Sequence, residues 1–240
     1  MDKQAYDFLG GEILLVDKPL HWTSFDVVNK LRYALLSRYK IKKIKVGHAG
    51  TLDPLATGLL IICSGKATKR IEQFMGLPKS YDGVMRFGAT TPSYDLETEI
   101  DEEFDIQPSD YEIVKERVGG FIGDIQQMPP LFSAKKVKGK KAYDVARRGG
   151  RIELKPADIT IYDFEVFNQN WPDVLFKVRC SKGTYIRSLA HDLGRATNLG
   201  AHLTELRRTA IGDYSLQDAR SLEEWLEIIS TAPLVENHAF

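Results

Sequence analysis

The chain has 240 residues, 43% of them hydrophobic, and its 33 basic and 33 acidic side chains give a formal net charge of zero. This length and apolar content are enough for one large domain with its own core, and the neutral charge argues against a generic nucleic-acid coat protein. Because the sequence has no 18-residue apolar run and no signal-peptide pattern, we expect a cytoplasmic protein that contacts no membrane.

Hydrophobic periodicity predicts alternating strands and helices in the first half of the chain. We expect strands at 12–17, 59–63 and 81–87 and helices at 67–75 and 108–118. A further helix is expected to begin at Thr23 or Ser24, with Asp26 favourably placed at its positive end. The apolar stripe of that helix consists of Phe25, Val28, Leu31 and Leu35.

The second half of the chain continues the alternation after a basic interruption. Residues 128–155 carry a Pro-Pro turn, lysines at 135–141 and a short helical patch at 142–148, which suits an insertion that grips a ligand. The elements expected after it are strands at 158–167, 174–180 and near 202–210, a helix at 184–197 and a short helix from Ser221. This order predicts an α+β protein built around a mixed sheet.

Charged residues are unevenly distributed along this neutral chain. Residues 38–70 contain eight Lys or Arg and one acid, and residues 135–155 contain nine Lys or Arg and two acids. Residues 94–116 contain ten Asp or Glu and one Lys. These blocks indicate a polarised surface with one face for an anionic partner, although solvated helix faces would give the same pattern.

The cysteines and histidines show no metal-binding pattern. Cys63 and Cys180 lie in apolar, strand-like segments, so we interpret them as small core residues in a reducing compartment. The five histidines are scattered and form no HExxH or Cys/His set. We therefore expect no metal site.

The most informative motif is the loop Gly47–Gly58, which runs directly into the apolar segment 59–62. It places one carboxylate, Asp53, among three glycines, Pro54 and small hydroxylic residues. Glycines allow positive φ and close approach of a ligand, and Pro54 biases Asp53 towards an extended conformation. The pattern predicts a rigid loop that presents Asp53 at a strand edge, unless Asp53 only bonds the backbone of an ordinary turn.

A second motif, Ser181-Lys182-Gly183-Thr184-Tyr185-Ile186-Arg187, follows the alternating run 174–180 and opens a helical pattern. With the Asp53 loop it resembles the pseudouridine synthases, in particular the TruB family of tRNA pseudouridine-55 synthases. The similarity extends in order over residues 11–212. Its further segments are Lys18-Pro19 with Thr23-Ser24-x-Asp26, Gly65-x-Ala67-Thr68-Lys69, Lys79-x-Tyr81, Gln127-Met128-Pro129-Pro130 and Leu206-Arg207-Arg208-Thr209.

The resemblance implies the pseudouridine synthase fold, a large mixed β-sheet with flanking helices and a central catalytic cleft. It implies isomerisation of the uridine at position 55, in the TΨC stem-loop of tRNA, by base flipping and an aspartate-dependent rearrangement that needs no cofactor. Asp53 is then the catalytic carboxylate, acting as nucleophile or base. Arg187 is its ion-pair partner, and Tyr81 stacks on the uracil and assists proton transfer.

The same resemblance implies substrate contacts outside this catalytic set. His48 takes the space that the flipped nucleotide leaves, Tyr185 forms a second aromatic wall, and Leu206 borders the uracil. Phosphates are contacted by the basic run at 135–141, Lys69 and Lys79. Without the resemblance, each of these side chains has an ordinary structural interpretation as a core, turn or surface residue.

The chain also departs from the family pattern. Leu20-His21-Trp22 follows Pro19 where the family usually has a glycine in the turn, so we expect a locally different turn. We expect a catalytic domain at 1–212 and a short helical extension at 213–240, with no separate C-terminal RNA-binding module and no required protein partner. Two other functions are weighed: a non-catalytic RNA-folding module, and a metal-free hydrolase that uses Asp53 with His48 and for which no oxyanion hole is evident.

Overall fold

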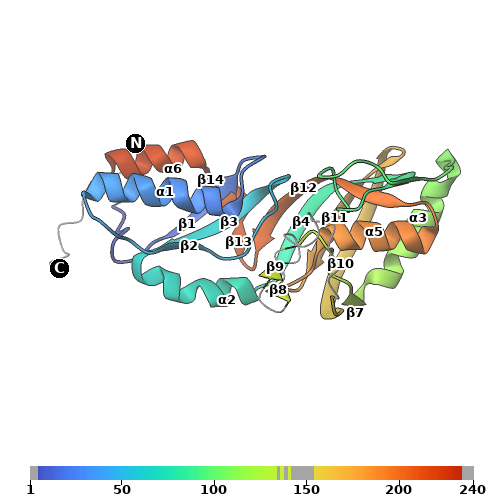
Figure 1. Ribbon diagram of the computed structural model, residues 1–240, viewed down its shortest axis with the longest axis horizontal. Helices are drawn as coiled ribbons and strands as arrows, with labels where there is room; N and C mark the ends of the chain where they lie inside the picture. The colour runs from blue at the N-terminus through green and yellow to red at the C-terminus, as the bar shows by residue number, and fades with distance from the viewer. Residues whose placement is uncertain (1–4, 134–135, 138–139, 142–153, 234–240) are drawn as a thin grey trace. The chain divides into compact units, whose positions relative to one another are not determined.

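The computed structural model describes residues 5–133, 136–137, 140–141 and 154–233. Contacts divide the chain into two compact units, one of residues 1–79 with 207–240 and one of residues 80–206. Strand β12 (Ala201–Ile211) runs from the second unit into the first (Figure 1). Within the described ranges, no helix is long and apolar enough to cross a bilayer.

The first unit is organised around strand β3 (Ala56–Ser64). Its neighbour β1 (Ile13–Lys18) runs antiparallel to it and parallel to the short β14 (Arg220–Ser221), so the sheet is mixed. β2 (Val46–His48) pairs with the C-terminal end of β3, and β13 (Tyr214–Ser215) pairs with the last residues of β12.

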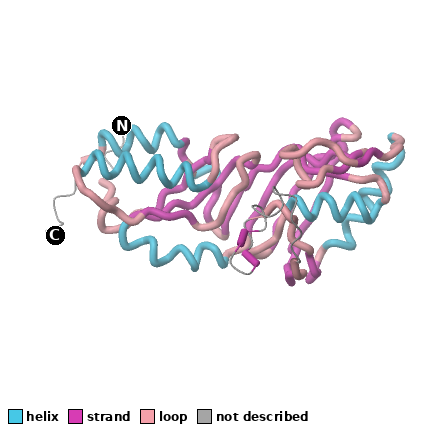
Figure 2. The backbone as a smooth tube through the Cα atoms, viewed as in Figure 1, coloured by secondary structure: helices cyan, strands magenta, loops and turns pink. Residues whose placement is uncertain are grey.

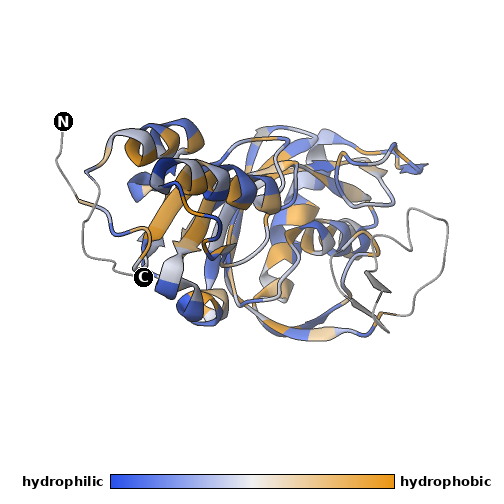
Figure 3. Cartoon of the chain, turned by 60° about the vertical axis from the view of Figure 1, so that its left-hand side comes forward, coloured by the Kyte–Doolittle hydropathy of each residue, from blue (hydrophilic) through white to orange (hydrophobic). Residues whose placement is uncertain are grey.

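Helices cover both faces of these strands. On one face α1 (Ser24–Tyr39) and α6 (Leu222–Thr231) lie side by side (Figure 1) and share a cluster with Leu60 and Ile62. On the other face, the 3-10 helix η1 (Gly65–Arg70) and α2 (Ile71–Gly76) pack against the alternate residues of β3, which are Leu59, Ile61 and Cys63. Because both faces are covered, β3 is a continuous apolar run, as Figure 3 shows for the strands beneath the helices.

Local sequence accounts for the start of α1. Thr23 is the N-cap, and its hydroxyl accepts from the Asp26 N–H while the Asp26 carboxylate accepts from the Thr23 N–H, which is a capping box. Val28, Leu31 and Leu35 are buried as predicted, but Phe25 is 60% exposed and lies 6.0 Å from the Arg32 guanidinium. The predicted stripe is therefore wrong at Phe25.

The second unit contains strands in the order β12-β4-β11-β10-β7. Their bounds are β4 Lys79–Phe87, β7 Gly123–Gln127, β10 Ala157–Asn170 and β11 Asp173–Cys180. Figure 2 shows strands in magenta and helices in cyan. The helices are α3 (Tyr111–Val118) and α5 (Ile186–Thr197), and the single-turn 3-10 helices are η2 (Pro108–Asp110) and η3 (Gly119–Phe121). Two-residue strands form separate pairs, β5 (Ala89–Thr90) with β6 (Glu102–Glu103) and β8 (Lys136–Val137) with β9 (Lys140–Lys141).

Most predicted elements are present with small shifts of their ends. The segments predicted as helices at 67–75 and 108–118 each begin with a 3-10 turn, and the last helix is α6, capped by Ser221 after the 3-10 turn η4 (Leu216–Asp218). Both cysteines are buried, and neither forms a disulfide among the described residues. The helical patch predicted at 142–148 lies outside the described residues, as does most of the basic insertion.

Candidate active site

The Asp53 loop is held by hydrogen bonds from three separate segments of the first unit. The Ser24 hydroxyl, at the start of α1, accepts from Leu52 N at 2.8 Å and donates to Leu52 O at 3.1 Å. The backbone N–H of His21 donates to Pro54 O at 2.8 Å, and Ala56 N donates to Asp53 O at 3.1 Å. Asp53 itself is half-buried. These contacts fix the backbone on both sides of Asp53.

After Ser24 and His21, the third group that bonds the Asp53 loop is the guanidinium of Arg208, which is 1% exposed. Its Nε donates to Leu59 O at 2.7 Å, and Nη1 and Nη2 donate to Thr51 O at 3.4 Å and Gly50 O at 3.2 Å. The planar fork thus bonds the loop before Asp53 and the strand after it. Arg208 belongs to the segment Leu206-Arg207-Arg208-Thr209, but the sequence predicted no role for it.

Gly58 is required where the loop enters β3. Its φ is +101°, and a Cβ at this position would lie 2.3 Å from the backbone oxygen of Arg208. Only glycine permits this φ together with this approach of two backbones. The spacing of the motif therefore has a structural cause in addition to any catalytic one.

Two cations act on the carboxylate of Asp53 or its loop. Lys18 is fully buried, and its ammonium donates to Pro19 O at 2.9 Å and Trp22 O at 2.5 Å. Burial lowers the pKa of Lys18 to about 8, while the negative charge of Asp53 acts in the opposite direction. Near neutral pH, Lys18 and Arg208 make the surroundings of this loop positive.

His48 is the last residue of β2 and is half-buried. Burial lowers its pKa, and the nearby Arg208 charge lowers it further. The ring is therefore neutral at pH 7, and its Nδ1 is buried without a hydrogen-bond partner among the described residues. A flat neutral ring five residues before Asp53 suits contact with a nucleobase. That His48 takes the space of the flipped nucleotide stays a prediction.

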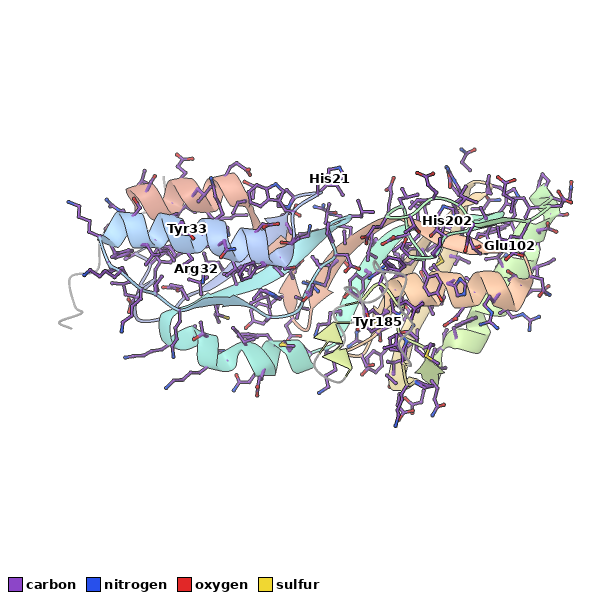
Figure 4. All side chains as sticks on the ribbon, viewed as in Figure 1. His21, Arg32, Tyr33, Glu102, Tyr185 and His202 are labelled. Carbon is purple, nitrogen blue, oxygen red and sulfur yellow. The ribbon has the colours of Figure 1, made fainter. Side chains whose placement is uncertain are left out.

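The second unit places Tyr185 and Arg187 at the predicted strand-to-helix junction. Tyr185 is the N-cap of α5 (labelled in Figure 4), and the buried Gln127 amide bonds both of its backbone groups, accepting from N at 2.8 Å and donating to O at 3.0 Å. Tyr81 on β4 is 8% exposed, and Leu206 on β12 is half-buried.

Arg187 is 5% exposed and is fixed by two separate segments, one at Ser93–Asp95 and one at Phe132. Its Nε lies 3.5 Å from a carboxylate oxygen of Asp95, Nη1 donates to Ser93 O at 3.1 Å, and Nη2 donates to Phe132 O at 2.9 Å. Asp95 belongs to the acidic stretch 94–116, which had been interpreted only as surface charge. The hydroxyls of Thr91 and Ser93 both donate to Asp95 O. These two hydroxyl residues just before Asp95 are the sequence feature that could have predicted a buried turn here.

The two lysines assigned to phosphate contacts differ in their surroundings. Lys69 in η1 is exposed. Lys79 is 6% exposed, and its ammonium donates to Phe74 O, Met75 O and Leu77 O at 3.4, 2.7 and 2.6 Å. Lys79 therefore caps the carbonyl end of α2, where a cation is favoured, and we correct its assignment from phosphate contact to structural cap.

Comparison with known proteins defines the class. The description TruB family pseudouridylate synthase (N terminal domain) matches residues 38–186, and tRNA pseudouridylate synthase B C-terminal domain matches residues 187–233. The protein class is thus a pseudouridylate synthase, and the expected α+β fold with a large mixed sheet and flanking helices is confirmed. The chain belongs to the TruB family.

Individual relatives agree with this membership. Proteins named tRNA pseudouridine synthase B from Phocaeicola vulgatus and Flavobacterium johnsoniae are 55% and 53% identical, covering 92% and 89% of this chain and 95% and 93% of their own. Among solved structures, a Cbf5-Nop10-Gar1 complex contains a chain that is 28% identical with a TM-score of 0.65. That match covers 92% of this chain, which spans about half (54%) of the length of that solved chain.

Proposed function

We propose that this protein isomerises a uridine of tRNA to pseudouridine, and that the uridine is position 55 in the TΨC stem-loop. Relatives named tRNA pseudouridine synthase B support the reaction and the class of RNA. The reaction breaks the N1–C1′ bond and joins C5 to C1′, while C5 loses a proton and N1 gains one. Atoms and electrons balance within the nucleoside, so no cofactor is required.

The observation that carries the assignment is the clamped loop of Asp53. The backbone on both sides of Asp53 is held by Ser24, Arg208 and the His21 N–H, so the loop loses little entropy when it meets a substrate. Attack at C1′, attack at uracil C6 and removal of a ribose proton all use an ionised carboxylate, so Asp53 serves each of these first steps.

We assign supporting roles to residues of the second unit. Arg187 is proposed to pair with Asp53 in the catalytic state, because its buried guanidinium is already oriented by Asp95 and two carbonyls. Tyr81 is proposed to stack on the uracil and to assist removal of the C5 proton. Tyr185 and Leu206 are proposed to border the base.

The RNA is proposed to be held by groups that read shape and charge. His48 fills the space that the flipped nucleotide vacates, which offsets part of the few kcal/mol that unstacking costs. The exposed Lys69 contacts a phosphate. We further propose that the enzyme acts in the cytoplasm and needs no protein partner.

The reaction is tested with tRNA transcripts that carry tritium at C5 of uridine. The wild-type chain should release tritium from such a tRNA, and an otherwise identical tRNA with cytidine at position 55 should release none. Release from both transcripts would contradict position 55. No release from either would contradict the proposed reaction.

A further inference from the structure

We infer that the loop between α1 and β2, residues 40–45, binds the phosphodiester backbone of the tRNA at a distance from the catalytic loop. This inference rests on the proposed function and adds a contact surface to it. The loop carries four lysines and two isoleucines in the order Lys-Ile-Lys-Lys-Ile-Lys. No acid occurs between Asp26 and Asp53, so the whole segment that leads to the catalytic carboxylate is cationic.

The backbone of this loop is fixed at both ends. Lys40 ends α1 in the left-handed conformation, with φ of 53°, and Ile41 N donates to Leu36 O at 3.2 Å. Ile44 packs against the core cluster beneath α1, and Lys45 O accepts from Gly65 N at 2.9 Å. The Ile44 side chain and the backbone bonds of Ile41 and Lys45 thus anchor a loop whose lysines are exposed, so binding a phosphate costs little ordering of the backbone.

The charges of the loop are not neutralised by carboxylates of the described residues. Lys40, Lys42, Lys43 and Lys45 are all exposed. Within the part of the chain that the structure describes, no ion pair joins any of these ammonium groups to a carboxylate. The two acids that influence the adjacent Tyr39, Asp7 and Glu12, accept hydrogen bonds from backbone amides. The loop is therefore a concentrated positive patch that suits a polyanion.

The position of the loop relative to the candidate site follows from strands β2 and β3. β2 begins one residue after Lys45 and ends at His48, five residues before Asp53. The bond between Lys45 O and Gly65 N also brings the loop against η1, whose exposed cations are Lys66, Lys69 and Arg70. Asp53 O accepts from Ala56 N at the opposite end of β3, so the nine residues of this strand place this strip of cations roughly 25 Å from the loop that presents Asp53. Both lie within one unit of the fold, and we expect a tRNA bound at Asp53 to reach the strip with another part of its backbone.

The chemistry of the patch specifies what it reads. Lysine ammonium groups are point charges without the planar fork or the ring that would recognise a base edge or stack on a base. Such contacts position an RNA backbone without selecting its sequence. We therefore expect the loop to contribute affinity and salt dependence, and not the choice of nucleotide.

The test uses the full chain and measures binding of an unmodified tRNA transcript between 50 and 200 mM salt. Lys42→Gln/Lys43→Gln should weaken binding roughly ten- to a hundredfold at 0.1 M salt and reduce the slope of log K against log salt by about 1 to 2. Lys42→Arg/Lys43→Arg should restore wild-type binding because the charge is kept. The matched control is Lys115→Gln/Lys177→Gln, which removes two exposed cations of the second unit and should change affinity by less than about twofold.

Two outcomes would overturn the inference: wild-type affinity and slope in Lys42→Gln/Lys43→Gln, or an equal loss in the control. Unchanged melting temperatures are expected in all three variants, since the four lysines are exposed, and they separate lost binding from lost folding. Tritium release by the wild-type chain, measured in parallel, separates failure of this inference from failure of the proposed function. If the wild-type chain releases tritium and Lys42→Gln/Lys43→Gln binds tRNA as the wild type does, only the inference about the loop is contradicted.

Discussion

The guanidinium of Arg187 and the carboxylate of Asp95 form an ion pair of 3.5 Å in which both side chains are buried, with exposed fractions of 5% and 7%. Removing one charge from such a pair leaves the other without compensation in a poorly solvated place. We predict that Asp95→Asn lowers the free energy of unfolding by about 3 kcal/mol, measured by urea denaturation. Activity should fall with it, because Arg187 loses its orienting partner.

An exposed ion pair in the same unit is the control for Asp95. Arg86 and Asp173 lie 2.7 Å apart, but their side chains are 50% and 27% exposed. Asp173→Asn should cost less than about 1 kcal/mol, since water and salt screen this pair. Equal losses of unfolding free energy in Asp95→Asn and Asp173→Asn would show that the buried Arg187–Asp95 pair stabilises the fold no more than the exposed pair.

Arg208 is expected to act on catalysis by positioning the Asp53 loop. Arg208→Lys keeps the charge but loses the fork that reaches Leu59, Thr51 and Gly50. We predict a loss of about 2 kcal/mol in stability and a fall in kcat that exceeds any rise in KM. Steady-state kinetics with the tritiated tRNA measure both constants. A change confined to KM would contradict a positioning role.

Gly58 gives a purely steric prediction. Gly58→Ala combines a φ of +101° with a Cβ 2.3 Å from the Arg208 backbone, so we expect a loss of at least about 2 kcal/mol in thermal or urea unfolding. Gly76→Ala is the matched control, because a Cβ there meets nothing within 4 Å. It should stay within about 0.5 kcal/mol of the wild type.

Lys18 predicts a pH dependence of stability. Its pKa falls from 10.5 in the unfolded chain to about 8 in the folded protein, so between pH 8 and 10.5 the unfolded chain binds more protons. Stability contributed by this group therefore rises with pH through that window. Compared with Lys18→Met, the wild type should gain up to about 3 kcal/mol between pH 8 and 10.5. Parallel curves for the two proteins would refute this.

The parts of the fold that sequence predicted well depend on local chemistry. The capping residues Thr23 and Ser221 start helices where expected, because each accepts from a backbone N–H within its own turn. The apolar run of β3 identified a strand covered on both faces. The loop of Asp53 was recognisable because glycine and proline restrict the backbone directly.

The errors arose where segments distant in the sequence determine the surroundings of a side chain. Lys79 was assigned to a phosphate contact on the family resemblance, but its ammonium donates to three carbonyls at the end of α2. Asp95 was not singled out because its partner, Arg187, lies 92 residues further along the chain. Phe25 has helical spacing, yet it is 60% exposed in the described part of the chain. Periodicity gives the face of a helix but not the extent of its cover.

The central claim is that the Asp53 carboxylate performs the chemistry, and single-turnover release of tritium from tRNA tests it most directly. Asp53→Asn preserves size and removes the charge, and it should reduce the rate by a factor of the order of 10⁴ or more while still binding tRNA. Asp105→Asn, an exposed acid in the second unit, is the control and should react as the wild type does. Release by Asp53→Asn at the wild-type rate would contradict the account.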